Sequence, residues 1–340
     1  MKVLSGLKLN EIEFLMSEMN ATKFRAKQIH NWIYAKSVAT FDEMTNLSKD
    51  FREELKTKFV VTQSKIKLKQ VSSDGTIKYL IEYPDGECVE TVLMRFDNRA
   101  NLTACVSSQV GCAVNCSFCA TGKRGFVRNL TAVEIIEQVL TIQRDTGLKI
   151  TNVVFMGQGE PLLNLDNVLK ALEIFNEDFQ IGARRITIST SGIIPQIDEL
   201  ANKELQSTLA ISLHAPNHKL RAELMPIENK YSIDMLKKSL LNYINKTGRR
   251  ITIEYILIHG FNDTVECAKE LAYYLKDLKC NINLIPYNSV DDTKYKKSSN
   301  NDIMRFKYLL EHSGKKVTVR LERGADIDAA CGQLKGKIKN

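Results

Sequence analysis

The sequence of 340 residues lacks several features that would assign it to common protein classes. No apolar run approaches the roughly 18 residues that a membrane-spanning helix needs. The amphipathic start "MKVLSGLKLNEIEFL" does not have the pattern of a signal peptide. No Gly-x-Gly-x-x-Gly follows the first predicted strand, and no phosphate loop ending in Gly-Lys-Ser/Thr occurs. We therefore expect a cytoplasmic protein with no membrane partner and without the usual nucleotide-binding folds.

An acidic excess is also absent, because 48 Lys and Arg residues outnumber 40 Asp and Glu residues. The resulting net charge of +8 is concentrated near the N-terminus, where residues 1–70 contain 13 basic and 8 acidic side chains. A local basic excess suits a polyanionic partner such as a nucleic acid. On charge alone, however, a solvated helical surface is an equally simple interpretation.

The order of apolar patterns predicts an α/β fold of two unequal parts. Residues 1–70 show helical spacing and no clear strands, and the stretch from "IKYLIEY" to "VETVLMR" predicts a hairpin with a "PDGE" turn. Strand and helix patterns then alternate, which is typical of a parallel sheet with helical crossovers. We expect a partial (β/α)6 barrel of the TIM type after a small helical domain. The expected boundaries are 1–72 (basic helical domain), 73–98 (hairpin extension) and 99–340 (barrel). The expected barrel strands are "ACVSSQ", "NVVFM", "RITIST", "TLAISLH", "ITIEYIL", "NINLIPY" and "KVTVRL".

Polar side chains follow most of these predicted strands. In β/α barrels the reactive groups lie at the C-terminal ends of the strands, so these side chains are expected to line one ligand site. A single serine at a strand end is usually structural, and only the group as a whole points to a site. The residues are Glu160, Ser189, Ser191, Ser212, His214 and Asn288.

Three cysteines follow the first barrel strand with the spacing Cys112-x3-Cys116-x2-Cys119. Structural zinc sites have four ligands, and no fourth cysteine or histidine lies nearby in the sequence. Three thiolates instead suit a four-iron cluster with one open iron, which can bind the amino and carboxylate groups of S-adenosylmethionine. The motif "GQGEP" fits, because glycines let the backbone approach a ligand and Glu160 can accept hydrogen bonds from an ammonium group.

These motifs together make the sequence resemble the RlmN family, radical S-adenosylmethionine enzymes that methylate C2 of an adenosine in 23S rRNA and of the adenosine 3′ of the anticodon in some tRNAs. The resemblance covers nearly the whole chain and implies a radical S-adenosylmethionine barrel. Its motifs, in family order, are "FRAKQIHNWIY", "FDEMTNLSK", "VETVLM", "CVSSQVGCAVNCSFCATG", "GQGEPLLNLDNV", "RRITISTSGIIP", "LAISLHAPN", "LMPI", "TIEYIL" and "DIDAACGQL".

The resemblance also implies roles for individual residues. Cys331 would be the cysteine that carries the methyl group, Cys105 the resolving cysteine, and Glu90 the general acid/base. A [4Fe-4S] cluster would be held by Cys112, Cys116 and Cys119. The residues implied to contact S-adenosylmethionine are Gly159, Glu160, Ser189, Ser212, Leu213, His214 and Asn288.

The implied chemistry explains why two further cysteines are needed. C2 of adenine is a poor nucleophile, whereas a thiolate attacks a sulfonium methyl group readily. In the family, one S-adenosylmethionine methylates the cysteine and a second supplies a deoxyadenosyl radical that activates this methyl group for addition to C2. A carboxylate then removes the C2 proton. The second cysteine releases the product and forms a disulfide with the first.

Several points stay open in the sequence. Gln158 stands where most relatives have methionine. The loop after Glu90 is longer than usual, which makes Glu90 the least certain of the assigned site residues. A Cfr-type enzyme that methylates C8 of adenosine shares the cluster motif and both cysteines, and a non-catalytic zinc module that binds RNA is a further alternative. We expect residues 1–70 and the basic tail "KGKIKN" to contact RNA phosphates. We also expect a monomer that receives electrons from a flavodoxin or ferredoxin.

Overall fold

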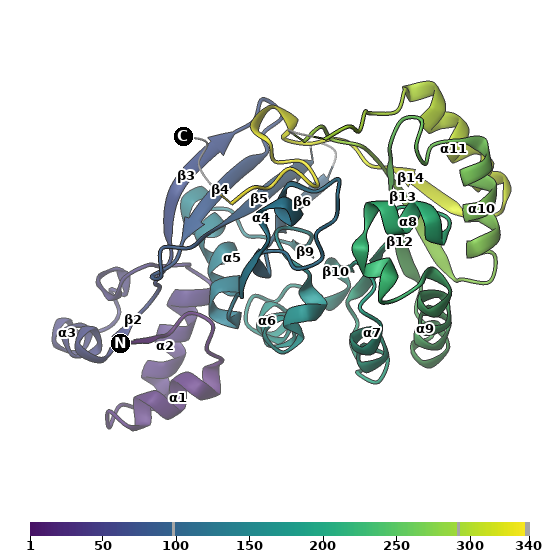
Figure 1. The fold of residues 1–340 in the computed structure, drawn as a ribbon. Coiled ribbons are helices and arrows are strands. Elements are labelled where there is room, and N and C mark those ends of the chain that lie inside the picture. The colour runs from purple at the N-terminus through teal and green to yellow at the C-terminus, as the bar shows by residue number, and fades with distance from the viewer. Residues whose placement is uncertain (97–98, 291–292, 337–340) are drawn as a thin grey trace.

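A ten-stranded sheet organises the computed structural model, which describes residues 1–96, 99–290 and 293–336 (Figure 1). The strand order is β14-β13-β12-β11-β10-β9-β6-β5-β4-β3. In this sheet β6 and the strands from β9 to β14 are all parallel, so their C-terminal ends meet at one edge. Strands β14 and β3 end the sheet at opposite sides, which confirms the partial barrel. The parallel strands are β6 (Arg99–Cys105), β9 (Asn152–Phe155), β10 (Ile186–Thr190), β11 (Thr208–Ser212), β12 (Ile251–Leu257), β13 (Cys280–Pro286) and β14 (Lys316–Val319).

Amphipathic helices connect the parallel strands, as the sequence predicts. The first, α5 (Ala132–Thr146), begins at Thr131, whose hydroxyl accepts from the N–H of Glu134 while the Glu134 side chain accepts from the N–H of Thr131. This reciprocal arrangement is a capping box, and the three-residue spacing of Thr131 and Glu134 is its signature in the sequence. The other crossover helices are α6 (Leu165–Glu177), α7 (Ile194–Leu200), α8 (His218–Leu224), α9 (Ile233–Thr247), α10 (Val265–Leu275) and α11 (Asn300–His312).

An antiparallel extension widens the sheet beyond β6. Strands β4 (Ile77–Glu82) and β5 (Cys88–Phe96) form the predicted hairpin, and β5 pairs with β6. Strand β3 (Lys65–Val71) adds a further antiparallel edge, so the expectation that residues 1–70 lack strands is wrong there. Almost every side chain of β3 is exposed. An edge strand with lysine at alternate positions buries little apolar surface, and burial is the signal that identifies a strand in a sequence.

The N-terminal region is mainly helical, as expected, and packs on the barrel beside α5 (Figure 1, purple). A two-stranded parallel pair, β1 (Lys2–Val3) with β2 (Phe59–Val60), ties its two ends together. The fully buried Glu137 on α5 accepts hydrogen bonds from Ser5, Thr62, Gln63 and Ser64. Its helices are α1 (Leu9–Ser17), α2 (Lys23–Tyr34), η1 (Phe41–Glu43) and α3 (Lys49–Lys58).

Short elements complete the chain, and all but the one that directly precedes β10 follow a barrel strand in the chain. None of the helices in the described part of the chain is long and apolar enough to cross a membrane. The tail "KGKIKN" extends past the described residues, which end at Gly336. The remaining elements are β7 (Gln109–Gly111), α4 (Ala120–Arg124), β8 (Phe126–Asn129), η2 (Pro161–Asn164), η3 (Ala183–Arg185), η4 (Pro226–Asn229) and η5 (Ala325–Ile327).

Candidate functional site

The cysteine loop lies between β7 and β8, which pair in antiparallel fashion after the first barrel strand. Gly111 closes the base of this loop with φ +74°, and a Cβ atom there would lie 1.8 Å from the carbonyl oxygen of Gly125. Only glycine fits such a close approach of two backbones. The loop therefore brings Cys112, Cys116 and Cys119 to the C-terminal edge of the sheet.

All three cysteines line one cavity, which we call the rim cavity. Residues that follow four other barrel strands line it too, so the structure brings together most of the predicted site. Ser191 and Glu254 are lining residues that the sequence did not assign to cofactor binding. The lining residues relevant to the argument are Cys112, Cys116, Cys119, Gly159, Glu160, Ser189, Ser191, Ser212, His214, Glu254, Arg320 and Cys331.

The cysteine thiols suit a metal cluster better than a single ion. Burial raises the pKa of Cys112 to about 12 and that of Cys116 well above its usual value, so only a strong local positive charge would keep them as thiolates. Ligands of one zinc ion, at about 2.3 Å from the metal, lie within about 4 Å of one another. Among the described residues, the group with ligand atoms all within 4.8 Å of one another is His259, Asp263 and Asp302, not the three cysteines.

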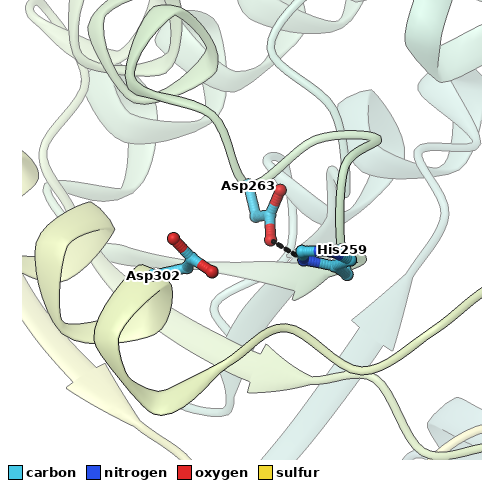
Figure 2. Close-up of side chains that lie close together, drawn as sticks. All are labelled: His259, Asp263 and Asp302. Carbon is cyan, nitrogen blue, oxygen red and sulfur yellow. Dashed lines mark ion pairs between the residues drawn. The ribbon is translucent and has the colours of Figure 1, made fainter.

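His259 and Asp263, in the loop after β12, lie close to Asp302 at the start of α11 (Figure 2). Asp263 accepts hydrogen bonds from the N–H of Gly260 (2.9 Å) and the hydroxyl of Ser298 (2.7 Å). The carboxylate of Asp302 accepts a hydrogen bond from the hydroxyl of Ser299, the N-cap residue of α11. Local donors thus already occupy both carboxylates, and the group fixes the loop after β12 against the start of α11.

Glu160, the fourth residue of the "GQGEP" motif, is held by several hydrogen bonds. One carboxylate oxygen accepts from the N–H and the hydroxyl of Ser191, both at 2.7 Å, and the other accepts from the N–H of Leu162. Burial raises the pKa of this carboxyl group, although these hydrogen bonds act in the opposite direction. Glu160 therefore has a fixed orientation at the rim, with Ser191 as its partner from the β10 end.

His214 adds a neutral hydrogen-bonding group to the rim cavity. It has φ +59°, and its Nδ1 accepts from the N–H of Ile256 at 3.1 Å. Burial, together with the Arg221 cation, lowers the pKa of His214 to about 3. With Nδ1 acting as acceptor, the proton of the neutral ring lies on Nε2, which can donate a hydrogen bond. The ring also packs edge-on against Phe118 of the cysteine loop, with centroids 5.0 Å apart.

The other predicted cofactor contacts divide into three groups. The hydroxyls of Ser189 and Ser212 lie 3.4 Å apart in the rim cavity. Leu213 is fully buried in the core, and its carbonyl accepts from Arg221. Asn288 donates to the carbonyl of Cys331 at 3.1 Å, while its buried Oδ1 has no partner among the described residues. An unmatched buried acceptor fits a ligand that brings a donor, such as the amine or hydroxyl groups of S-adenosylmethionine.

A second and larger cavity, the inner cavity, has a volume of about 580 Å³ and lies against β5, β6, β9, β13 and β14. Cys105 and Cys331 both line it, and Cys331 also lines the rim cavity. Burial raises the pKa of Cys105 to about 12. All eight cysteines lie in the described part of the chain and none is bonded to another, so the predicted disulfide is not present.

Arg320 stands where the two cavities meet. Its guanidinium lies 3.7 Å from the sulfur of Cys331, 3.4 Å from the sulfur of Met156 and 3.7 Å from Glu254. The pKa of Arg320 is raised: burial lowers it, but the negative charges of Glu254, Cys331 and Cys105 together more than offset that effect. This cation is a residue that the sequence analysis missed, because nothing in "TVRLERG" distinguishes it from a surface arginine.

Glu90 lies on β5 beneath the C-terminal segment and outside the described lining of both cavities. Its carboxylate contacts the ammonium group of Lys78 at 3.0 Å and accepts from the N–H groups of Lys335 and Gly336. Gln158 accepts from the N–H of Glu90 at 3.0 Å, and the Nε2 of Gln158 is buried without a partner in the described chain. Glu90 thus faces the segment that carries Cys331, and Gln158 supports its backbone.

The C-terminal segment is attached directly to the cysteine loop. The N–H of Ala120 donates to the carbonyl of Gly332 (2.7 Å), and the hydroxyl of Thr121 donates to the carbonyl of Leu334 (2.8 Å). In Figure 1 this segment (yellow) crosses the sheet near β5, β6 and α4. Cys331 is therefore held over both cavities by contacts with the loop that would carry the cluster.

Comparisons with known proteins agree with this geometry. Residues 106–272 match the family model of the radical SAM superfamily, and residues 3–61 match the N-terminal domain of ribosomal RNA large subunit methyltransferases. The chain is 51% identical to a probable dual-specificity RNA methyltransferase RlmN of Alkaliphilus oremlandii over 98% of this chain and 97% of the relative. A Bacillus subtilis protein with the same description is 48% identical, over 98% and 92% respectively.

A solved structure shows the same fold over the full chain. The radical SAM methyltransferase from Sphaerobacter thermophilus is 43% identical, with a TM-score of 0.94 over 99% of this chain and 100% of that chain. The superfamily implies a [4Fe-4S] cluster and S-adenosylmethionine as cofactors, and the residues of the rim cavity fit both. The alternative of a non-catalytic zinc module is therefore wrong. The chain belongs to the RlmN family of radical S-adenosylmethionine RNA methyltransferases.

Proposed function

We propose that this protein methylates C2 of an adenosine in 23S rRNA and in a subset of tRNAs, using an S-methylcysteine at Cys331 as the methyl carrier. The observation that carries the proposal is the position of Cys331, which lines the rim cavity and the inner cavity at once. A residue in this position can meet a cofactor on one side and a nucleobase on the other. The relatives' description as dual-specificity RNA methyltransferases supports the two substrate classes.

When bound, the cluster and two S-adenosylmethionine molecules supply the methyl group and the radical that activates it. The chain's own residues do the rest. The thiolate of Cys331 attacks the methyl group, with the Arg320 cation 3.7 Å away to stabilise the negative sulfur. Glu90 then accepts the C2 proton, which requires Lys335 and Gly336 to release its carboxylate. Cys105 attacks the sulfur of Cys331 and forms a transient disulfide as the product leaves.

We also propose the domain boundaries, the oligomeric state, the location and the electron donor of the protein. The domains are a basic helical domain at 1–72, an extension carrying Glu90 at 73–98, and a barrel with the methyl-carrying segment at 99–340. The protein works as a monomer in the cytoplasm and receives electrons from a small acidic donor such as flavodoxin or ferredoxin.

Mass spectrometry of the purified protein tests the first step. We expect the peptide that contains Cys331 to be heavier by one CH2 unit after expression with an intact cluster. The C331A variant should lack both this modification and RNA methylation. A fully active wild-type enzyme whose Cys331 peptide is never methylated would overturn the methyl-carrier role.

Nucleoside analysis of the modified RNA tests the position of methylation. Digestion of treated 23S rRNA and tRNA should yield 2-methyladenosine. An 8-methyladenosine product without the 2-methyl isomer would assign the protein to the Cfr-type reaction instead.

A further inference from the structure

The interior of this barrel is unlike that of a packed TIM barrel. Side chains of branched apolar residues normally fill such an interior in layers. Here threonine and asparagine side chains of five barrel strands line the inner cavity, beside valine, methionine and isoleucine. Thr103 on β6 pairs in register with Asn152 on β9, and Asn283 on β13 pairs with Thr318 on β14. A cavity of about 580 Å³ lies within the usual range for a bound organic ligand, roughly 300–1,000 Å³.

The inner cavity spans the height of the barrel. One end reaches Cys105, the last residue of β6, and Cys331. The opposite end reaches Asn152, the first residue of β9, and Arg185, which directly precedes β10. The cavity thus connects the N-terminal edge of the sheet with the two cysteines that face the substrate.

The outer end of the inner cavity is strongly basic. Arg184 and Arg185 of η3 line it and are exposed. Within the described ranges 1–96, 99–290 and 293–336, no ion pair or hydrogen bond is found for either guanidinium. Across the same opening, the guanidinium of Arg323 lies over the ring of Phe96 at 5.5 Å. Exposed arginines without partners bind phosphates, and an arginine–aromatic pair offers a surface on which a base can stack.

We infer that the RNA strand approaches the barrel from its N-terminal edge, where Arg184 and Arg185 bind the phosphates that flank the target adenosine. The adenine then passes along the layer of threonines and asparagines to Cys331. This inference rests on the proposed function for the identity of the base, but it concerns a surface outside the N-terminal domain and the tail. The depth of the cavity favours a nucleotide over an acidic protein partner, because a protein surface would contact the arginines without entering a cavity that extends to the cysteines.

The test compares two pairs of adjacent arginines. Arg249 and Arg250 also directly precede a barrel strand, β12, but they contact Gln206 and Asn281 instead of lining the cavity. R184Q/R185Q and R249Q/R250Q therefore remove the same charge from the same edge. Binding of an unmodified tRNA anticodon hairpin to each cluster-containing protein is measured against salt concentration. We expect R184Q/R185Q to bind about tenfold more weakly at moderate salt, with a slope of log Kd against log salt shallower by about 1.4.

A second variant tests the cavity wall next to the two arginines. N152D is nearly isosteric and keeps the oxygen that accepts from Thr151, but it adds a negative charge. We expect N152D to lower kcat/KM for RNA methylation by about tenfold, with cluster content and methylation of Cys331 without RNA unchanged. Wild-type kcat/KM in N152D would exclude passage of the base through this cavity.

The possible results test the path of the RNA and the proposed function independently of each other. If R184Q/R185Q binds RNA like the control pair, the inference is wrong, whatever product the wild-type enzyme makes. It is equally wrong if this variant keeps its RNA affinity and loses only reduction by flavodoxin, since the arginines would then serve the electron donor. If the wild type makes no 2-methyladenosine, the proposed function fails, and the comparison of affinities still decides where RNA binds.

Discussion

His214 illustrates how burial at one residue determines a response to pH. Its pKa falls from 6.5 to about 3 on folding. Between these values the unfolded chain binds a proton that the folded chain excludes, so the free energy of unfolding decreases as the pH falls from 6.5 towards 3. At pH 4.5 this loss amounts to about 3 kcal/mol.

The variant H214N tests this contribution. Asparagine tolerates the positive φ of this position, and its Oδ1 can accept from Ile256 in place of Nδ1. Urea unfolding at pH 7 and pH 4.5 should show a smaller loss of stability in H214N than in the wild type. An equal loss in both proteins would show that other groups cause the acid sensitivity.

Glu90 and Lys78 form a buried ion pair, in which the carboxylate and the ammonium nitrogen lie 3.0 Å apart. We expect E90Q to lower RNA methylation by at least about a hundredfold, since an amide cannot accept the C2 proton. Methylation of Cys331 without RNA should persist, because that step does not involve Glu90. Loss of both reactions in E90Q would mean that the substitution disturbs the C-terminal segment rather than proton removal.

At the scale of elements, the loop after β9 depends on glycine at position 159. It has φ +99°, and a Cβ atom there would lie 2.5 Å from the Cβ of Gln109. Gly147 at the end of α5 also has a positive φ, +67°, but no atom lies within 4 Å of its hypothetical Cβ. G147A should therefore cost only the conformational strain, about 1 kcal/mol, in urea unfolding. G159A should cost clearly more and should also weaken S-adenosylmethionine binding, and equal costs would contradict the steric argument.

The elements show which parts of the fold the sequence could predict. Most of the seven barrel strands contain buried valine or isoleucine, and α5 carries both a capping box and a glycine end, so local patterns identify them. The strand β3 lacks that burial signal, and α7 has only seven residues. The cysteine spacing predicts a shared site, because all three cysteines lie close together in one loop. Arg320 and Glu254 could not be assigned, because their roles depend on contacts between segments far apart in the chain.

At the scale of the whole molecule, Glu137 joins the N-terminal region to the barrel. Its carboxylate accepts from four donors at 2.7–3.0 Å, and it is fully buried. E137L would leave these donors buried without partners and should lower the free energy of unfolding by about 3 kcal/mol or more. E137Q, which keeps an acceptor oxygen, should cost less. Urea unfolding gives both values, and equal losses would show that packing rather than hydrogen bonding determines the cost.

The position of β3 also changes how the RNA-binding role of the N-terminal domain should be tested. A truncation at residue 72 removes an edge strand of the main sheet together with all four donors to Glu137. A shortened protein that begins at residue 62 keeps the strand and three of these donors, and it follows the end of the matched N-terminal family model at 61. We expect this shorter protein to assemble its cluster, measured by iron content and absorbance, and to lose RNA methylation. Retained methylation would show that the N-terminal helices are dispensable.

The hydrogen bonds from Ala120 and Thr121 to the C-terminal segment make the cysteine loop an anchor for the chain's end. The two acceptors, Gly332 and Leu334, closely follow Cys331, and the two donors directly follow the last cysteine of the loop. A displacement of the cysteine loop would therefore be passed to the backbone beside Cys331, so these two parts of the site keep a common frame of reference.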